Sequence, residues 1–364
     1  MSDSSNNSLH KAKSAKNDEF YTQYHDIEKE MQAYLEYNEN VFRGRTILLP
    51  CDDPDWSNFT KYFAQNFERF GIKKLISTSY APISKGLDFK TQPSHLEIND
   101  ERFDKEKHET KGKIFTITRD INNDSRIDIN DLEWDYLEGD GDFRSDEITK
   151  IAEDVDLIIT NPPFSLFREF LAWILGLNKG FSIIGNKNAI TYKEVYPLIK
   201  DNLMWSGSMP MGNDILFHIP NSMADEFIEN KKQGSGYRIV NNEVMARATG
   251  MWFTNIEHGR RHEPLQLMTM EDNLRYNKKV IKNKSDKNTI YQKYDNYDAI
   301  EVGYTDAIPS DYNGVMGVPI SFLDKYNPEQ FEIIKFRKGD DKKDLAIDGY
   351  TPFFRVLIKK VYPK

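Results

Sequence analysis

The chain has one cysteine, Cys51, among its 364 residues. A single cysteine excludes a disulfide framework and a zinc site made of cysteine thiolates. No apolar run approaches the roughly 18 residues that a membrane-spanning helix requires. The first residues are polar and lack the apolar core of a signal peptide. We therefore expect a cytoplasmic protein with no membrane association, in which residues 1–16 form a disordered leader.

The sequence also lacks a recognisable set of metal ligands. Its seven histidines are scattered, and His258 and His262, four residues apart, have no further ligands nearby. This spacing alone does not make a zinc site. We predict that the protein holds no metal.

Basic residues are in the minority, with a net charge of −9 overall. The balance differs along the chain: residues 231–300 carry 13 basic and 8 acidic side chains, a local net charge of +5. A solvated charged face is one explanation for this excess, and a nucleic-acid-binding surface is the other. Length and composition suit one large or two modest globular domains.

Short apolar runs alternate with helical patterns over the first 200 residues. Strands are expected at 46–49, 74–78, 134–137, 157–160 and 181–185, with an edge strand at 113–118. Helices are expected at 56–70, 145–155 and 192–200, and after Ser165, which can cap its helix. This alternation predicts an α/β fold with a mostly parallel sheet and helices on both faces. Further strands are expected at 216–219 and 251–254, and a polar insertion at about 84–112.

The most informative residues directly follow the apolar run at 155–160. They are Asn161-Pro162-Pro163-Phe164. The asparagine oxygen and the Pro162 carbonyl can accept hydrogens from a planar amino group, while the prolines restrict the backbone and Phe164 offers a surface for stacking a base. Pro-Pro also occurs in rigid turns with no catalytic role. Position favours the catalytic interpretation, because ligands of parallel α/β sheets bind at the carboxyl ends of strands.

The tetrapeptide resembles the catalytic motif of S-adenosylmethionine-dependent amino-methyltransferases. Several further strings, in the right order from about residue 17 to the C-terminus, resemble the EcoRI-type adenine-specific DNA methyltransferases. This resemblance implies a Rossmann-like methyltransferase domain over residues 17–258 and an α+β target-recognition, DNA-binding region over residues 259–364. The strings are Asn17–Thr22, Cys51–Pro54, Trp56–Phe59, Gly141–Glu147, Gly185–Ile190, Trp252–Asn255 and Gly317–Phe331.

The resemblance also implies which residues hold the cofactor. Phe20, Tyr21 and Thr22 match the motif that contacts its methionine part, although an N-terminal aromatic packed on the sheet would look the same. Asp52 and Asp53 are expected to pair with the methionine ammonium, or else to cap the next helix. Asp142 is expected to accept a hydrogen bond from the amino group of the cofactor's adenine, and Phe143 is expected to line the pocket for that adenine. The alternative is that Gly141-Asp142 is simply a turn.

Two departures from the broader methyltransferase pattern concern the cofactor. Residues 52–55 contain no glycine where a glycine loop is usual, and residues 77–80 lack the acid that normally holds the ribose hydroxyls. The candidates to replace that acid are Thr78, Ser79 and Asp88. For DNA, the resemblance places Asn186 and Lys187 at the base pocket, with an exposed loop as the alternative. The basic residues expected to hold DNA are Arg260, Arg261, Lys278 and Lys279, with Lys282 and Lys284 beyond them.

The function implied is methyl transfer from S-adenosylmethionine to N6 of a flipped-out adenine in double-stranded DNA. The host context would be a restriction–modification system, whose endonuclease shares the site without binding this chain, or an orphan or phage methylase. Rival interpretations are an amino-methyltransferase for cytosine N4, RNA or a protein glutamine, and an inactive DNA-binding module with the same fold. Asn161 in place of serine favours adenine by family resemblance, and the basic region disfavours a protein substrate.

Overall fold

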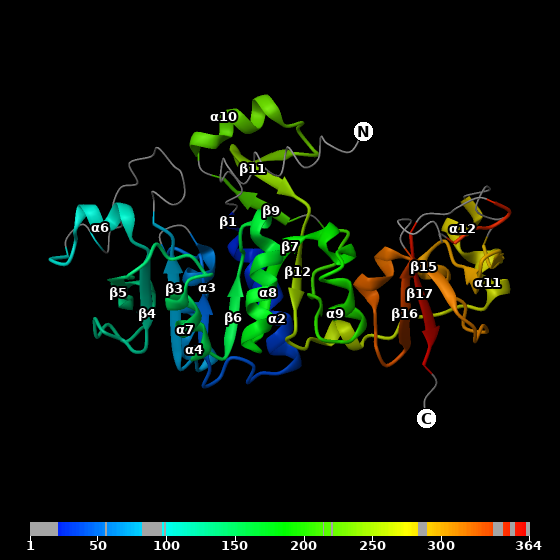
Figure 1. The fold of residues 1–364 in the computed structure, drawn as a ribbon, viewed down its shortest axis with the longest axis horizontal. Coiled ribbons are helices and arrows are strands. Elements are labelled where there is room, and N and C mark those ends of the chain that lie inside the picture. Colours follow the sequence, from blue (N-terminus) through cyan, green and yellow to red (C-terminus); the bar gives the residue numbers. More distant parts are fainter. Residues whose placement is uncertain are drawn as a thin grey trace. The chain divides into compact units, whose positions relative to one another are not determined.

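The computed structural model describes residues 21–54, 57–81, 97, 100–213, 215–219, 221–282, 290–337, 345–349 and 354–361. The chain divides into two compact units (Figure 1). Unit 1 comprises residues 1–189 and 212–257, and unit 2 comprises residues 190–211 and 258–364. Within the described ranges, no helix combines the length and apolar character needed to cross a bilayer.

Unit 1 is a mixed α/β structure around one large sheet. Its strands run in the order β5-β4-β3-β2-β6-β7-β12. The bounds are β2 Thr46–Leu49, β3 Lys74–Ser79, β4 Lys113–Ile117, β5 Glu133–Tyr136, β6 Leu157–Thr160, β7 Gly180–Asn186 and β12 Gly250–Thr254. Strands β3, β2, β6 and β7 are parallel. Every residue of β2 and β6 is buried, as expected for central strands of a sheet covered on both faces.

Helices cover both faces of this sheet. On β7, Ser182 faces α2 (Tyr24–Tyr37), where Tyr34 Oη lies 2.9 Å from Ser182 Oγ. Gly185 lies three positions farther along β7 and therefore on the other face of the sheet. It packs against Phe167 of α8 (Phe167–Leu177), so closely that a Cβ on Gly185 would come within 2.2 Å of the Phe167 ring. The α/β class and the two covered faces are confirmed.

The remaining helices of unit 1 begin and end close to the expected residues, with two corrections. The expected helix 56–70 is divided at Asn66 into α3 (Asn58–Gln65) and α4 (Phe67–Phe70). Ser145 caps α7 (Asp146–Glu153) by accepting from the Ile148 amide. Ser165 is not a helix cap, because residues 164–166 form a 3₁₀ turn, η3, and α8 starts from Leu166 without a side-chain cap. The other elements are α6 Lys105–Thr110 and η2 Ile129–Asp131.

Strand 113–118 was expected at an edge, and the structure corrects this. Strand β4 pairs antiparallel with β3 on one side and with β5 on the other. The apolar–polar alternation of β4 therefore reflects one buried face rather than an edge position. Strands β4, β5 and β12 make the sheet mixed rather than mostly parallel.

A second, antiparallel sheet in unit 1 has the order β1-β9-β11-β10. It joins the start of the described chain to a later segment: β1 pairs with β9, and β9 with β11. In Figure 1, β9 and β11 lie at the top of the large sheet, close to α10. The bounds are β1 Tyr21–Thr22, β9 Ile215–His218, α10 Asn221–Asn230, β10 Tyr237–Val240 and β11 Glu243–Ala248.

Unit 2 contains its own five-stranded sheet, in the order β13-β14-β15-β17-β16. A buried fork, in which Arg355 donates to both carboxylate oxygens of Glu301, joins β17 to β14. The strands of the five-stranded sheet are β13 Lys293–Tyr294, β14 Tyr297–Glu301, β15 Met316–Pro319, β16 Phe331–Arg337 and β17 Arg355–Lys360; the short strand β8 Trp205–Ser206 also belongs to unit 2 but lies outside this sheet. The helices of unit 2 are α9 Tyr196–Lys200, η5 Gly259–His262, α11 Met270–Tyr276, α12 Lys278–Lys282, η7 Thr305–Ala307 and η8 Ile320–Lys325; η4 Lys187–Thr191 spans the junction of the units.

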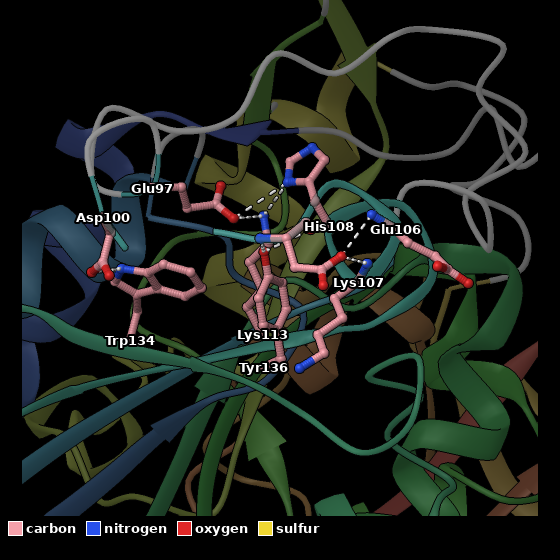
Figure 2. Close-up of polar contacts among 9 residues, drawn as sticks. Glu97, Asp100, Glu106, Lys107, His108, Lys113, Trp134 and Tyr136 are labelled. Carbon is pink, nitrogen blue, oxygen red and sulfur yellow. Dashed lines mark hydrogen bonds and ion pairs between the residues drawn. The ribbon is translucent and has the colours of Figure 1, made fainter. Parts of the chain in front are cut away.

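A buried ionic cluster holds the described part of the polar insertion on β4 (Figure 2). Glu97 is fully buried, and its Oε1 lies 2.7 Å from Lys113 Nζ and 3.3 Å from His108 Nδ1. Beside this cluster, the Trp134 indole donates to Asp100. Buried ions need such partners to offset the loss of hydration, so the cluster fixes the insertion on the sheet. Residues 82–96, 98 and 99 lie outside the described residues.

Candidate active site

The Asn161–Phe164 tetrapeptide begins directly after β6, at the carboxyl ends of the parallel strands. Asn161 is half-buried, Pro162 is buried and Pro163 is half-buried. Because β2, β3 and β7 run parallel to β6, their final residues reach this same edge. We call this the carboxyl edge of the sheet. It brings together the expected catalytic and cofactor segments.

Phe164 connects the tetrapeptide to the small sheet. Its ring lies perpendicular to that of Phe217 on β9, with 5.9 Å between centroids. Phe217 is directly opposite Thr22 of β1. The Thr22 carbonyl in turn accepts a hydrogen bond from the side-chain amide of Asn58 at the start of α3. The expected methionine-contacting motif and the tetrapeptide are thus neighbours, while Phe20 and the Tyr21 side chain lie outside the described part of the chain.

Asp52 is tied into the loop after β2. Only 5% of it is exposed, and the Ser57 hydroxyl donates to its Oδ1 at 2.6 Å. The Thr160 hydroxyl donates to its Oδ2 at 2.5 Å and also lies 2.6 Å from the Pro50 carbonyl oxygen. Since Thr160 immediately precedes Asn161, the Asp52 carboxylate holds the backbone from which the Asn161 side chain extends. Asp53 is partly exposed at the same loop, and its carbonyl accepts from the Ser57 amide.

The turn that replaces the usual glycine loop uses a cysteine. Cys51 has φ of 67°, in the left-handed region that glycine normally occupies. A side chain in this region costs about 1–2 kcal/mol. The hydrogen bonds around Asp52 hold the turn in place despite that cost.

A close backbone contact fixes the loop that carries Asp142. Gly141 has φ of +84°, and a Cβ there would lie 2.3 Å from the Ser79 carbonyl oxygen at the end of β3. A Cβ on Gly112 would lie 2.7 Å from both Gly141 and Ser79. The Ala81 amide donates to the Asp140 carbonyl at 2.8 Å. Asp142 is therefore positioned at the carboxyl edge beside the end of β3, where its expected partner would bind.

Asp142 is part of a charged network. Arg144 donates from Nε to Asp142 Oδ1 at 2.9 Å and from Nη2 to Oδ2 at 2.5 Å, and its Nη1 donates to Glu169 on α8 at 2.9 Å. Burial tends to raise the pKa of Asp142, but hydrogen bonds from Arg144 and Tyr80 outweigh it and lower the pKa below its ordinary value. Burial, followed by the nearby Cys51 and Asp142, raises the pKa of Tyr80. Asp142 is therefore a carboxylate, and Tyr80 a neutral donor.

Phe143 lies in the core next to this network. It is fully buried, with its ring 4.9 Å from Phe170 and 5.6 Å from Trp173. Its packing against α8 anchors the residue after Asp142. Its expected role as a pocket wall stays a prediction.

The end of β3 offers hydroxyls where an acid is usual. Ser77 Oγ donates to the Asp52 carbonyl and lies 3.0 Å from Thr60 Oγ1. Thr78 is fully buried, and its hydroxyl meets no hydrogen-bond partner among the residues that the structure describes. Ser79 is buried at the Gly141 contact. Asp88, the other substitute considered for the ribose, lies outside the described residues.

Asn186 and Lys187 extend past β7 on the same edge. The Asn186 amide donates to Thr249 Oγ1 at 3.2 Å, and Lys187 Nζ donates to the Asn213 carbonyl at 2.6 Å. Both side chains are half-buried. They cross-link the end of β7 to the segments around β9 and β12. A role in lining the base pocket stays a prediction.

The basic residues expected to contact DNA fall into two groups in unit 2. Arg261 is 8% exposed, with its guanidinium 3.6 Å from the centre of the Trp205 ring, and Arg260 donates to Asp324 at 2.8 Å. Lys278 and Lys279 on α12 are exposed, although Lys279 also pairs with Asp306. The two arginines thus have partners inside unit 2, whereas the two lysines present their charge at the surface.

Several residues of the site carried no sequence signal of their own. Ser57 and Thr160 serve as donors to Asp52, and Tyr80 and Arg144 as donors to Asp142. Arg144 lies only two residues beyond Asp142, so a charge pair at this spacing was a detectable hint. Tyr80 is 62 positions away, and only the fold brings it close. Among the described residues, no cluster of His, Cys, Asp and Glu could hold a metal ion.

Comparison with known proteins identifies the family of this chain. The model of the family "Adenine-specific methyltransferase EcoRI" matches residues 8–360. The chain is 44% identical to the Type II methyltransferase M.EcoRI of Escherichia coli, over 97% of this chain and 96% of that protein. It is 31% identical to M.MgeORF184P of Mycoplasma genitalium, over 97% and 98%, and 30% identical to M.MpnI of Mycoplasma pneumoniae, over 90% and 84%; both are Type II methyltransferases.

No solved structure matches the chain. The family model spans almost all of it, and the relatives align over nearly their full length. The chain belongs to the EcoRI family of adenine-specific methyltransferases and is a site-specific DNA methyltransferase.

Proposed function

We propose that the protein transfers a methyl group from S-adenosylmethionine to N6 of an adenine flipped out of double-stranded DNA. The observation that carries the proposal is the placement of Asn161 at the carboxyl edge, next to the Asp52 loop, with the Asp142 loop one strand farther along this edge at the end of β3. A Rossmann-type sheet binds ligands at this edge. The motif, the family and the position of the site support the same chemistry.

The described residues fit the cofactor. Asp142 is an ionised acceptor fixed at the carboxyl edge, which suits the amino group of an adenine. Thr78 contributes a buried hydroxyl with no protein partner among the described residues, which suits a polar ligand group such as a ribose hydroxyl. Since Asp52 is only 5% exposed, we assign the methionine ammonium to the more exposed Asp53. When bound, S-adenosylmethionine supplies an electrophilic methyl group on a sulfonium.

Asn161 and Pro162 would orient the nucleophile. The lone pair of an adenine amino group is delocalised into the ring, and the nitrogen is a weak nucleophile. Accepting its two hydrogens, with the Asn161 side-chain oxygen and the Pro162 carbonyl, directs the lone pair toward the methyl group. Positioning of this kind is worth several kcal/mol. The N–C bond forms as the S–C bond breaks, and one amino proton is released to solvent.

Access to this pocket requires the adenine to leave the duplex. Phe164 is half-buried and held by Phe217, so it is placed to stack on the extruded base. The exposed Lys278 and Lys279 would neutralise phosphates. Arg260 and Arg261, which have partners within unit 2, would shape the recognition unit rather than bind phosphate directly.

The test is Asn161→Ala. We expect S-adenosylmethionine binding and DNA binding to persist, by calorimetry and gel shift, while transfer of labelled methyl groups is lost. Phe59→Leu, in the core of the same unit, is the matched control for a general effect on folding. Methylation at the wild-type rate by the Asn161 variant would disprove the mechanism.

The biological context has its own experiment. We propose that the enzyme is the modification partner of a restriction endonuclease that shares its site. Sequencing DNA from a host that expresses the protein, with detection of N6-methyladenine, would identify the methylated sequence. Host DNA that carries this methylation should resist an endonuclease that cuts the same sequence. An absence of N6-methyladenine would rule out the proposed function.

A further inference from the structure

The hairpin β10–β11 of unit 1 has no role in the site described so far. Its two strands pair from Tyr237↔Ala246 to Val240↔Glu243. The two residues between them, Asn241 and Asn242, both have positive φ, 50° and 65°. This is the two-residue turn that matches the natural twist of a hairpin and makes it well defined. The hairpin is therefore a preformed ribbon.

The end of this ribbon exposes apolar side chains. Ile239 is 52% exposed and Val240 is 39% exposed, although both are β-branched residues that usually pack in a sheet. They lie on β10, the last strand in the order of the small sheet. An exposed apolar edge strand invites association. Its presence next to an active site indicates a binding surface.

The charge around these residues indicates what binds there. Residues 231–248 contain four basic side chains and one acidic side chain, in a chain whose net charge is −9. Lys231, Lys232 and Arg238 are exposed. Cations beside an apolar tip complement a duplex, whose phosphates flank the base edges in its grooves. A second copy of this acidic chain is a poorer electrostatic match.

The hairpin is also close to the base pocket. Phe217, which contacts Phe164, lies opposite Ala246 of β11, and Ala246 lies opposite Tyr237 of β10. Two strand spacings separate the backbone of Phe217 from β10, or about 10 Å, and Val240 is about 10 Å farther along the strand. A major groove about 12 Å wide admits a two-stranded ribbon of this kind.

We propose that the β10–β11 hairpin enters a groove of the DNA beside the flipped adenine, with Ile239 and Val240 against the bases and the flanking cations on phosphates. This inference rests on the proposed function for its DNA partner and deepens it by naming the contact surface. Apolar side chains placed against a base step favour its unstacking. The hairpin would thus assist extrusion of the adenine.

The first test measures contact. A benzophenone amino acid replaces Ile239, and the protein is irradiated with a 30-base-pair duplex that carries the methylated site. The control places the same group at Ile121, which is also exposed. Ile121 follows the end of β4. Because β4 runs antiparallel to β3, this end lies at the opposite edge of the sheet from Ser79. We expect a crosslink to DNA from position 239 and none from position 121. A crosslink to a second copy of the chain, or no crosslink, would overturn the proposal.

The second test measures flipping. The double variant Ile239→Ala, Val240→Ala should lose about 10-fold or more in kcat/KM on a matched duplex, from the apolar contact removed. A mismatch opposite the target adenine should restore most of that loss, because the base is then already loosened. Equal activity of variant and wild type on the matched duplex would refute a role in extrusion.

The two proposals fail in distinguishable ways. The crosslink at position 239 requires DNA contact but no catalysis, so it should also form in the Asn161→Ala background. A crosslink to DNA from position 239, together with no methylation of adenine by the wild-type protein, would refute the proposed function alone. A protein that methylates adenine without a crosslink would refute the hairpin assignment alone.

Discussion

The ionic cluster at Glu97 allows a quantitative test of how the polar insertion is held on the sheet. In Lys113→Met, the Glu97 carboxylate stays fully buried but loses the ammonium 2.7 Å away. Removing one partner of a buried pair costs about 3–5 kcal/mol, because an uncompensated charge remains. Conversely, Glu97→Gln leaves the buried Lys113 ammonium without the carboxylate of Glu97. We expect a loss of about 3–5 kcal/mol from it as well.

The double variant separates charge from packing. With Glu97→Gln and Lys113→Met together, no unpaired ion remains, and replacing a buried ion pair by neutral groups is often close to neutral. We expect the double variant to be more stable than either single variant, so the coupling energy, the two single losses minus the loss of the double variant, should exceed about 3 kcal/mol. Equilibrium unfolding in urea, followed by circular dichroism and tryptophan fluorescence, measures all four proteins. Losses that simply add in the double variant would refute the argument.

The remaining predictions concern the cofactor edge and the DNA surface. Gly141→Ala places a Cβ against the Ser79 carbonyl at positive φ; we expect S-adenosylmethionine affinity, measured by calorimetry, to fall at least about 10-fold because the loop must shift, and unchanged affinity would contradict the close contact. Arg144→Met removes donors that lower the pKa of Asp142, so the pKa of this carboxyl group should rise in the variant. Because Asp142 is a carboxylate only above its pKa, S-adenosylmethionine binding by the variant should be lost at a higher pH than in wild type as the pH drops from ~7 to ~4. Superimposable pH profiles of binding would argue against this role. Lys278→Glu should weaken DNA binding and reduce its salt dependence, whereas a salt slope equal to wild type in gel shifts would remove this residue from the DNA surface.

The sequence predicted the parts of the fold that depend on local pattern. The buried strands β2, β6 and β7 follow from short apolar runs, and the start of α7 from Ser145. The position of β4 inside the sheet was not predictable, because alternation reports one buried face and not the neighbours on each side. The break at Asn66 was missed for a similar reason, since apolar spacing continues across it.

The site shows the same division between local and long-range information. The apolar run before Asn161 predicted its position at the carboxyl end of a parallel strand, and the structure agrees; the roles of Asn161 and Asp142 stay predictions. The donors Thr160 and Tyr80 depend on neighbouring strands, which no sequence spacing reveals. Cys51 shows a further limit: the missing glycine predicted a changed loop, but not that a cysteine would adopt the left-handed conformation itself.

The division of the chain into units has a practical consequence for protein engineering. The polypeptide passes from one unit to the other three times, after residues 189, 211 and 257. A cut at 258, the boundary expected from sequence, would leave residues 190–211 on the catalytic fragment without the rest of unit 2. Among those residues is Trp205, on which Arg261 stacks. Exchanging unit 2 between relatives would therefore require transplanting two separated segments, residues 190–211 and 258–364, together.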